Sequence, residues 1–348
     1  MRPIEVGVLG GTGMVGQHFI RFLQGHPWFK LTWLGASDRS AGKKFSDATQ
    51  WRLDSDMPSS LRDIVVSDCQ PNSAPRLVFS AMDASVATEI EQAFARAGHI
   101  VVSNSRNHRM EPDVPLLVPE INPGHLSAIS VQRKNRNWQG AIVTNPNCST
   151  IVLTMALAPL VRFGIKSVIV STMQAVSGAG YPGVASMDIV GNVVPYIGSE
   201  EEKMQIETQK ILGGYVDGHF RPLDATVSAH CNRVAVVDGH VTAASVRLES
   251  KPTLEEVQEA IGSFRGLPQQ KNLPSAPAQP VVYLPQQDRP QPRRDAMRDN
   301  GMSVTVGRVR PCPVLDIKFV ACGHNTIRGA AGAAVLNAEL MAAEGILD

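Results

Sequence analysis

The first 105 residues combine two hydrophobic periods, one typical of strands and one typical of helices. Short apolar runs bounded by glycine or polar residues predict strands, and apolar residues at helical spacing predict helices between them. The predicted strands lie at 4–9, 31–34, 76–80 and 99–103, and the predicted helices at 14–23 and 84–97. This alternation predicts an α/β fold with a doubly wound parallel sheet. The polar, proline-containing stretches 40–62 and 105–140 predict loops or insertions.

The pattern changes at residue 148, where strands become more frequent and their connections longer. The predicted strands are 167–174, 233–237, 240–248, 281–283, 302–309 and 314–320, and the predicted helices are 149–163, 253–261 and 326–345. A turn at Asp238-Gly239 separates two of these strands, and Thr253 with Glu256 has the spacing of a capping box. We expect a mixed α+β second domain, with 267–298 as a surface excursion suited to a subunit contact. The alanine-rich last helix is expected to pack back on the first domain.

Charge and cysteine usage narrow the class of protein. The 348 residues carry a formal net charge of +1 without a block of like charges, which argues against a nucleic-acid-binding surface. The five cysteines are scattered without a CxxC pair, so neither a disulfide framework nor a metal site is expected. No apolar stretch is long enough to span a membrane, and the N-terminus lacks a signal-peptide pattern. A cytoplasmic enzyme is the expectation.

A glycine-rich turn joins the first strand to the first helix. Its residues are Gly10, Gly11, Thr12, Gly13, Met14, Val15 and Gly16. Such glycines let the backbone approach a pyrophosphate, which the helix N-terminus then stabilises. The context of strand, turn and helix predicts a dinucleotide site of the Rossmann type, and the alternative is an ordinary glycine-rich turn.

The segment after the second strand bears on the choice between NAD and NADP. Asp38 favours NAD, because an acidic residue there binds the ribose hydroxyls. Four neighbours can instead donate to a 2′-phosphate, namely Ser37, Arg39, Ser40 and Lys43. An anion needs several donors, so we predict NADP. A solvated loop of mixed charge is the alternative.

Cys148 is the candidate nucleophile. The turn Asn145-Pro146-Asn147 precedes it and an apolar helix follows, which places the sulfur at a helix N-terminus. The helix dipole there favours a thiolate. Backbone N–H groups and the Asn147 amide could form an oxyanion hole. Most free cysteines are inert core residues, which is the alternative interpretation.

A thiolate of this kind needs a group that handles its proton, and His240 is the candidate. It begins a strand seven residues after Arg233, which lies within an otherwise apolar segment. An arginine in that setting needs an anion. A substrate carboxylate and an internal acidic residue are equally good partners for it at this stage.

Three further segments suit anions or a substrate. Glu200 to Lys203 begin a helix, Arg106 and Arg109 follow a predicted strand at the ligand-binding edge of the sheet, and Gln174 to Gly180 end a strand in a glycine-rich loop. The acidic residues of the first segment could equally be a solvated helix start. Either arginine could bind a phosphate.

These motifs resemble those of the aspartate-semialdehyde dehydrogenase family, in its archaeal and fungal branch. The resemblance runs nearly end to end and covers 10–16, 37–43, 108–110, 145–150, 174–180, 200–203, 233–240 and 325–329. It implies an NADP-binding domain of residues 1–147 with 326–348, and a catalytic and dimerisation domain of residues 148–325. It also implies a homodimer or homotetramer.

The resemblance implies a role for each candidate residue. Cys148 would attack an acyl phosphate and His240 would act as acid and base. The substrate-binding residues would be Arg233 for the carboxylate, Glu200 for the amine, Gln174 for the acyl group, and Lys203, Arg109 and Asn147 for the phosphate. Ser80, Ser177, Gly178 and Asn325 would join the glycine-rich turn and the 37–43 loop in binding the cofactor.

The implied reaction is the NADPH-dependent reduction of L-4-aspartyl phosphate to L-aspartate 4-semialdehyde and phosphate through a cysteine thioester. Malonyl-CoA reductase of the same branch is the nearest alternative, since it shares the cysteine thioester and NADPH. N-acetyl-glutamyl-phosphate reductase is less similar in its cysteine motif. A non-catalytic, nucleotide-sensing protein would not need Cys148, His240 and Arg233 together.

Overall fold

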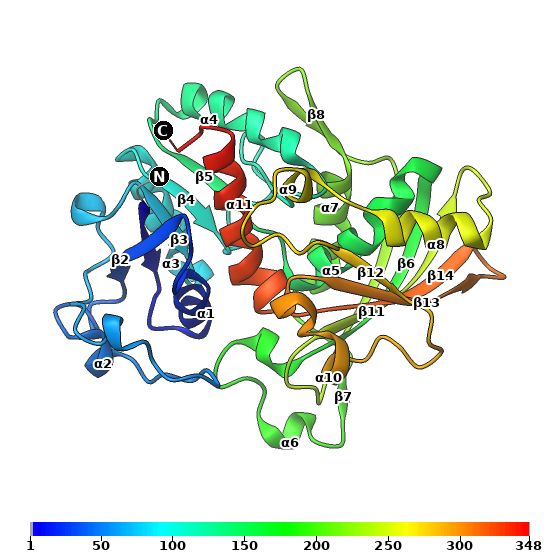
Figure 1. Cartoon of the computed structure of the whole chain (residues 1–348), viewed down its shortest axis with the longest axis horizontal. Coiled ribbons are helices and arrows are strands. Elements are labelled where there is room, and N and C mark those ends of the chain that lie inside the picture. Colours follow the sequence, from blue (N-terminus) through cyan, green and yellow to red (C-terminus); the bar gives the residue numbers. More distant parts are fainter. Residues whose placement is uncertain (1–2, 348) are drawn as a thin grey trace.

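The chain folds around two sheets that lie side by side, as the computed structural model of residues 3–347 shows (Figure 1). The first sheet has five parallel strands in the order β2-β1-β3-β4-β5. Its strands are β1 (Ile4–Leu9), β2 (Phe29–Gly35), β3 (Leu77–Ser80), β4 (Ile100–Ser103) and β5 (Ala141–Thr144). The predicted doubly wound parallel sheet is thus confirmed.

Helices cover both faces of the first sheet because successive strand residues point to opposite sides. Val8, Phe79 and Val102 pack with helices α1 (Met14–Leu23) and α11 (Gly332–Ala343), whereas Val78 and Val101 pack with α3 (Ala84–Arg96). The strands are buried on both sides, which explains their continuous apolar runs.

The stretches expected to be loops contain regular structure. They hold the short helix α2 (Phe45–Ala48), the helix α4 (Ala128–Arg136) and two 3₁₀ turns. The sequence of α4 is mostly polar, and only Ala128, Ile129 and Gln132 in it are buried. These residues are too few to show a helical period in the sequence. Tertiary packing, rather than an apolar face, therefore stabilises this helix. The 3₁₀ turns among residues 3–347 are Ser59–Leu61, Pro71–Ser73, Pro123–Ser127, Ala158–Phe163, Val176–Ala179 and Arg298–Gly301.

The second sheet is mixed and has seven strands in the order β12-β13-β14-β11-β6-β10-β7. They are β6 (Ile165–Gln174), β7 (Val193–Val194), β10 (Thr226–Val234), β11 (His240–Leu248), β12 (Val281–Leu284), β13 (Val304–Pro311) and β14 (Ile317–Gly323). Helices α5 (Cys148–Leu157), α7 (Glu200–Leu212) and α8 (Leu254–Ser263) pack on it around one core. The short elements β8 (Gly214–Val216) with β9 (His219–Arg221), α6 (Ser186–Ile189), α9 (Leu267–Gln270) and α10 (Pro292–Asp295) connect these parts. The predicted α+β domain is confirmed.

The turn at Asp238-Gly239 does not make a hairpin. Strand β6 lies between β10 and β11, parallel to the first and antiparallel to the second. The strand predicted at 233–237 runs from 226 to 234 instead. Residues 235–239 then form the connection that passes from β10 across the end of β6 to β11. Val236 and Val237 in that connection accept hydrogen bonds from the loop after β6, which the local sequence does not reveal.

The segment 267–298 is more than a surface excursion. It supplies the sheet strand β12, and Leu273 and Ala296 in it are buried. Its Ser275 N–H also donates to Glu339 of α11, which lies 2.7 Å from His26. The excursion therefore helps to fix the last helix in place.

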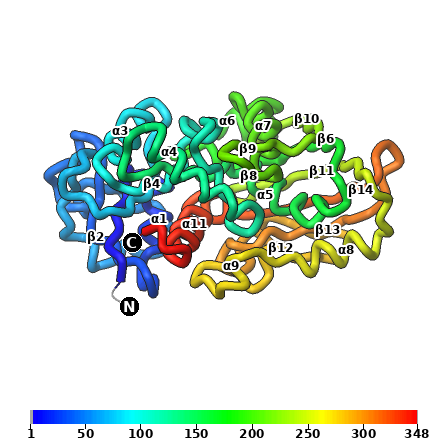
Figure 2. Tube along the Cα trace, turned by 90° about the horizontal axis from the view of Figure 1, so that it is seen from above, coloured from blue at the N-terminus to red at the C-terminus, as the bar shows by residue number. Residues whose placement is uncertain are grey.

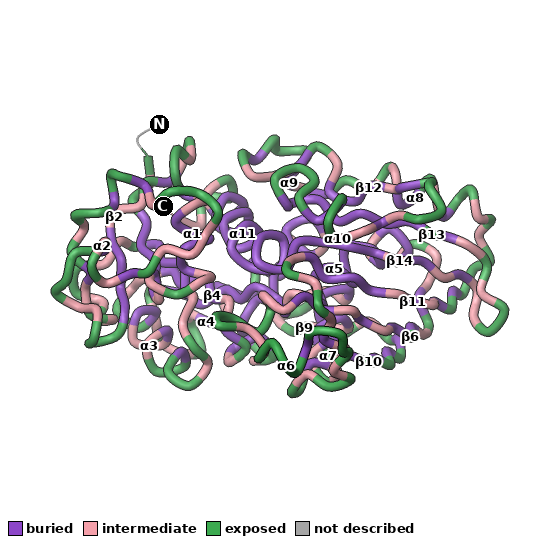
Figure 3. Tube along the Cα trace, turned by 90° about the horizontal axis from the view of Figure 1, so that it is seen from below, coloured by how far each residue is buried: buried purple, intermediate pink, exposed green. Residues whose placement is uncertain are grey.

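The chain returns to the first sheet through a buried C-terminal segment. A π-helical turn (Ile327–Ala331) precedes α11, and both are buried between the two sheets (Figures 2 and 3). The predicted return of this helix is confirmed, although its first turn is π-helical. Within residues 3–347, no helix has both the length and the apolar character needed to cross a membrane.

Candidate active site

Cys148 begins helix α5 directly after the last strand of the parallel sheet. Asn147 caps the helix, because its Oδ1 accepts from the Ser149 and Thr150 N–H groups at 3.0 and 3.3 Å. The sulfur is half-buried at this N-terminus. The position predicted from the sequence is the one that the chain adopts.

His240 reaches the sulfur from the start of β11, 92 residues away in sequence. Its Nε2 lies 3.1 Å from Cys148 Sγ, and its Nδ1 accepts a hydrogen bond of 3.0 Å from the Ala175 N–H. Because Nδ1 is an acceptor, the neutral imidazole has its proton on Nε2, facing the sulfur. His240 therefore meets Cys148 as a hydrogen-bond donor.

Both groups of this pair are neutral in the free site. Burial raises the pKa of the Cys148 thiol to about 12; Glu200 adds to the rise, and Arg233 and Arg109 oppose it. Burial, together with the charge of Arg233, lowers the pKa of His240 to about 3. The sequence predicted an ionised sulfur from the helix dipole, and the structure differs because desolvation outweighs that dipole.

Arg233 lies beside this pair at the end of β10. It is buried, its Nη1 donates to the Ala175 carbonyl at 2.7 Å, and no carboxylate in residues 3–347 lies within ion-pair distance of it. A Cβ atom on Gly178 would lie 2.9 Å from both Arg233 Nη1 and His240 Cε1. The absence of a side chain at residue 178 thus allows this loop to pack closely against the guanidinium and the imidazole.

Glu200, the first residue of α7, organises the polar side of the site. Its carboxylate accepts from Asn147 Nδ2 (2.9 and 3.0 Å), Gln174 Nε2 (3.0 Å) and Lys203 Nζ (2.8 Å). Burial alone would raise the pKa of Glu200, but Lys203 and the amide donors hold it below its ordinary value. Gln174 Oε1 remains a buried acceptor with no donor among the described residues.

The Asn147 side chain is not free to stabilise an oxyanion. Its amide N–H groups go to Glu200, and its backbone N–H donates to Glu207 at 2.7 Å. The Cys148 N–H is the better oxyanion donor, because the first residue of a helix has no intrahelical acceptor.

The basic residues predicted for a phosphate line one hollow of about 380 Å³, which also includes Ser199 and Glu207. Arg109 is buried and donates to Glu207 Oε1 (2.9 Å) and the Asn104 carbonyl (2.7 Å), while its Nε has no partner among residues 3–347. Arg106 is exposed, and among the described residues its side chain donates only to Ser199 Oγ, at 3.3 Å. Both arginines therefore face the hollow, and the structure brings Lys203 to the same place.

The glycine-rich turn has the geometry that a pyrophosphate needs. Gly10 has φ of +73°, and a Cβ there would lie 2.7 Å from the Ala81 carbonyl oxygen. A Cβ on Gly16 would lie 2.3 Å from the Gly10 carbonyl oxygen. Gly13 provides no side-chain cap to α1, so the N–H groups of that helix start are available to an anion.

The loop after β2 forms a tight turn that exposes its charged side chains. Ser40 N–H donates to the Ser37 carbonyl at 2.8 Å, and Arg39 and Lys43 are exposed with no ion pair within residues 3–347. Ser80 differs from these residues, because it is fully buried and its hydroxyl donates to Glu91 at 2.6 Å. The Ser80 carbonyl also accepts from the Asn104 N–H at 3.1 Å, so the cofactor role expected for Ser80 is limited to its place at the end of β3.

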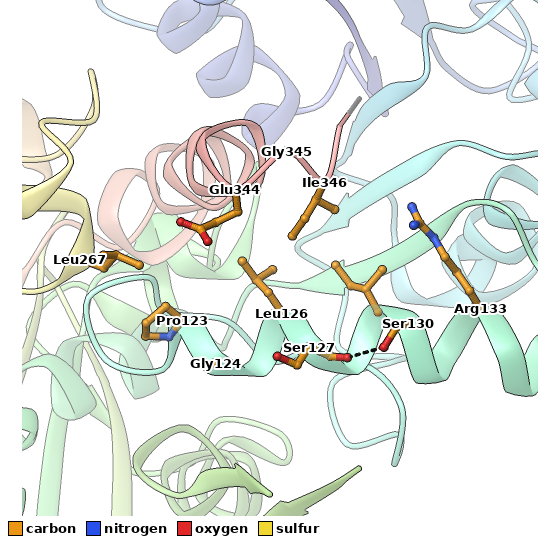
Figure 4. A pocket seen from close by; sticks show the side chains of 11 residues that line it. Pro123, Gly124, Leu126, Ser127, Ser130, Arg133, Leu267, Glu344, Gly345 and Ile346 are labelled. Carbon is orange, nitrogen blue, oxygen red and sulfur yellow. Dashed lines mark hydrogen bonds between the residues drawn. The ribbon is translucent and has the colours of Figure 1, made fainter. Parts of the chain in front are cut away.

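Asn325 connects the end of β14 to the substrate loops. Its Nδ2 donates to Ser177 Oγ and its Oδ1 accepts from the Gly239 N–H, both at 2.8 Å. Ser177 lines a cavity of about 880 Å³ between α1 and the 236–238 connection, which also borders Met14. A different hollow, of about 640 Å³, lies between α4 and the end of α11 and contains none of the predicted site residues (Figure 4).

Sequence reasoning missed two residues at the site, Glu207 and Lys210. They are 2% and 4% exposed, and Glu207 contacts both Arg109 and the Asn147 backbone. The available signal was their spacing of seven residues from Glu200 and Lys203, which places all four on one face of the helix. Charged residues on a buried helical face need partners, and that makes them candidates for a site.

Comparison with known proteins defines the class first. The model of the semialdehyde dehydrogenase NAD binding domain matches residues 5–129, and that of the semialdehyde dehydrogenase dimerisation domain matches residues 157–328. These two matches together span most of the chain and place it in the class of semialdehyde dehydrogenases.

Individual relatives narrow this class. The aspartate-semialdehyde dehydrogenase of Methanothermobacter thermautotrophicus is 52% identical over 97% of this chain and 99% of its own length, and that of Schizosaccharomyces pombe is 46% identical over 99% of both. The crystal structure of the Candida albicans enzyme with NADP has a TM-score of 0.92 at 44% identity and covers 99% of both chains. The chain belongs to the aspartate-semialdehyde dehydrogenase family.

Proposed function

We propose that the chain is an NADP-dependent aspartate-semialdehyde dehydrogenase, which reduces L-4-aspartyl phosphate to L-aspartate 4-semialdehyde and phosphate. The observation that carries this proposal is the 3.1 Å contact between Cys148 Sγ and His240 Nε2 beside the buried Arg233. A nucleophile, a hydrogen-bond donor to it and a carboxylate-binding guanidinium are the groups that this reaction needs.

Substrate binding uses the groups around the sulfur. Arg233 pairs with the α-carboxylate, which gives this buried guanidinium the anion that it lacks within the described chain. Gln174 Oε1 and Glu200 receive the ammonium group. The phosphate enters the hollow lined by Arg106, Arg109 and Lys203.

Acylation forms a bond between Cys148 Sγ and the acyl carbon. The Cys148 N–H stabilises the oxyanion that develops. As the bond from carbon to the phosphate oxygen breaks, the thiol proton leaves with the phosphate, so that a neutral thiol and an acyl phosphate give a thioester and inorganic phosphate.

Reduction then occurs at the thioester carbonyl. NADPH, when bound, supplies the hydride. The bond between carbon and sulfur breaks, the semialdehyde is released, and Cys148 departs as a thiolate. His240 Nε2–H stabilises that thiolate until a proton from solvent restores the thiol.

The cofactor-binding residues are proposed on the same structural grounds. The 10–16 turn would hold the pyrophosphate, and Ser37, Arg39, Ser40 and Lys43 would bind the 2′-phosphate. Ser177, Gly178 and Asn325 would contact the nicotinamide half, next to the 880 Å³ cavity. We place the domain boundary at residues 1–147 with 326–348 and 148–325, which agrees with the division between the two sheets.

Malonyl-CoA reductase is the alternative activity, and the polar groups around Glu200 argue against it. A buried amide acceptor and a carboxylate suit the ammonium of an aspartyl group, which malonyl-CoA lacks. The test compares NADP reduction by aspartate semialdehyde with phosphate against NADPH oxidation by malonyl-CoA. Turnover in the second assay alone would overturn the proposal.

We further propose that the chain forms a homodimer or a homotetramer through its second domain. The match to the dimerisation domain supports an oligomer. Large apolar side chains between residues 181 and 196 are exposed to solvent, namely Tyr181, Met187, Val190, Val193 and Tyr196. A patch of this kind is typical of a protein–protein contact.

A further inference from the structure

Helix α7 presents four charged residues on one face toward the active site. Glu200, Lys203, Glu207 and Lys210 are spaced by three, four and three residues, which brings them to the same side of the helix. The first pair belongs to the substrate site described above. The second pair lies deeper and contacts the loop that contains Arg109.

Glu207 joins that arginine to the backbone before the nucleophile. Its Oε1 accepts from Arg109 Nη1 at 2.9 Å and its Oε2 accepts from the Asn147 N–H at 2.7 Å. One buried carboxylate thus sets the separation between the phosphate hollow and the start of α5. Because both hydrogen bonds of Glu207 are charge-assisted, Arg109 and the start of α5 have little freedom to move relative to α7.

Lys210 holds the backbone of the same loop. Its Nζ donates to the carbonyl groups of Arg109 (2.7 Å), Glu111 (3.0 Å) and Val114 (3.0 Å), and it lies 4.1 Å from the centre of the Phe220 ring. An ammonium group has three N–H donors, and here all three are used. Residues 109–114 are therefore fixed to α7 at three points.

We propose that Glu207 and Lys210 are positioning residues, which hold Arg109 where it binds the phosphate of the substrate. The proposal rests on the proposed function. Neither residue touches the reacting atoms: Glu207 fixes the guanidinium of Arg109, and Lys210 fixes its backbone. Because transfer reactions are sensitive to displacements of about 1 Å, loss of either hold weakens phosphate binding before it affects the cofactor.

The Lys210→Met variant tests this proposal, since methionine retains an apolar stem but donates no hydrogen bond. We expect the KM for phosphate, measured with aspartate semialdehyde and NADP, to rise about tenfold or more. The KM for NADP should stay within about twofold, because the nucleotide turn lies on another loop. Lys251→Met is the matched control: its amine pairs with Asp316 on the surface, and we expect no change.

The isosteric Glu207→Gln variant gives a second, independent measurement. It retains an acceptor for the Asn147 N–H but loses the charge that holds Arg109, so it should raise the KM for phosphate and leave the KM for NADP unchanged. If both folded variants keep the wild-type KM for phosphate, or if all KM values rise together, the positioning role is wrong. Circular dichroism establishes folding, and if Lys210→Met does not fold, Glu207→Gln decides.

Failure of the proposed function gives a different result. In that case the wild type itself would show no phosphate-dependent NADP reduction. Protection of Cys148 from iodoacetamide by inorganic phosphate then measures phosphate binding in the hollow directly. Protection that is present in the wild type and weakened in both variants would still support the positioning role, and equal protection in all three proteins would overturn it.

Discussion

The protonation of Cys148 and His240 depends on their burial and not only on the contact between the two side chains. The Ala175 N–H fixes the imidazole as a donor at Nε2, and desolvation keeps both partners neutral. The sulfur therefore becomes negatively charged only during reaction, when the bond to the acyl carbon forms or breaks. A hydrogen bond to a charged acceptor is about twice as strong as a neutral one, so His240 contributes most at those moments.

Removal of the sulfur tests this pair directly. We expect Cys148→Ser to lower kcat by about 10³-fold or more, because a serine hydroxyl is a far weaker nucleophile at neutral pH. The affinity for NADP, measured by fluorescence titration, should not change. Substantial residual turnover would exclude the thioester.

The pH dependence of alkylation follows from the two pKa shifts. With the pKa of Cys148 raised to about 12 and that of His240 lowered to about 3, both groups stay neutral between about pH 6 and about pH 9. The rate of Cys148 carboxamidomethylation should therefore increase steadily with pH over this range, as the small thiolate fraction grows. A plateau below about pH 8 would instead indicate an ion pair. Mass spectrometry of the Cys148 peptide gives the rate.

The Gly178→Ala variant tests the close packing of residue 178 against Arg233 and His240. A methyl group there would lie 2.9 Å from both side chains. We expect Gly178→Ala to lower kcat/KM by about 100-fold, because the methyl group would displace Arg233 and His240 from their positions. Gly262→Ala is the control, since its Cβ meets nothing within 4 Å.

At the scale of elements, four elements converge on one point from different parts of the chain. The N-terminus of α5 brings the sulfur, the end of β6 and the start of β11 bring Gln174 and His240, and the N-terminus of α7 brings Glu200. Each element ends or begins at its functional residue. The site is therefore built from element termini, where backbone groups and side chains are free to meet a ligand.

We predict that the loop after β2 sets the preference for NADP over NAD. We expect Arg39→Ala to raise the Kd for NADP about tenfold and to leave the Kd for NAD unchanged, because only NADP has the 2′-phosphate. Lys44→Ala is a suitable comparison, since Lys44 already pairs with Asp63 and not with a ligand. If Arg39→Ala raised the Kd values for NADP and NAD equally, Arg39 would not be a ligand of the 2′-phosphate.

At the scale of the whole molecule, the last helix and the exposed apolar segment have opposite environments. Helix α11 is buried between the sheets, whereas the apolar side chains of 181–196 are exposed in the single chain. The first arrangement joins the nucleotide domain to the catalytic domain. The second leaves a surface that a further copy of the chain can cover.

The exposed segment predicts a measurable change of assembly. Met187 is 90% exposed, and we expect Met187→Asp to shift the oligomer toward monomer in light scattering, because a buried charge at an interface is costly. Val65→Asp, at an exposed position on the first domain, should leave the molar mass unchanged. An unchanged mass for Met187→Asp would exclude this segment from the interface.

Much of the fold followed from local patterns, and the exceptions have specific causes. Helix α1 and strand β11 have the boundaries that periodicity predicts, since a repeat of apolar positions is a property of neighbouring residues. Helix α4 is too polar to reveal its period. The strands on either side of the Asp238-Gly239 turn do not pair with each other, because β6 inserts between them.

The sequence by itself determined the nucleotide turn, the helix start at Cys148 and the two-domain order, because each depends on residues that are adjacent in the chain. Only the tertiary structure brought His240 to the sulfur, assigned the Asn147 amide to Glu200, and placed Glu207 and Lys210 beneath Arg109. Burial in the folded chain also raises the pKa of the thiol, which favours its neutral form. Contacts between distant residues and the desolvation of a buried group exist only once the chain has folded, so no local pattern encodes them.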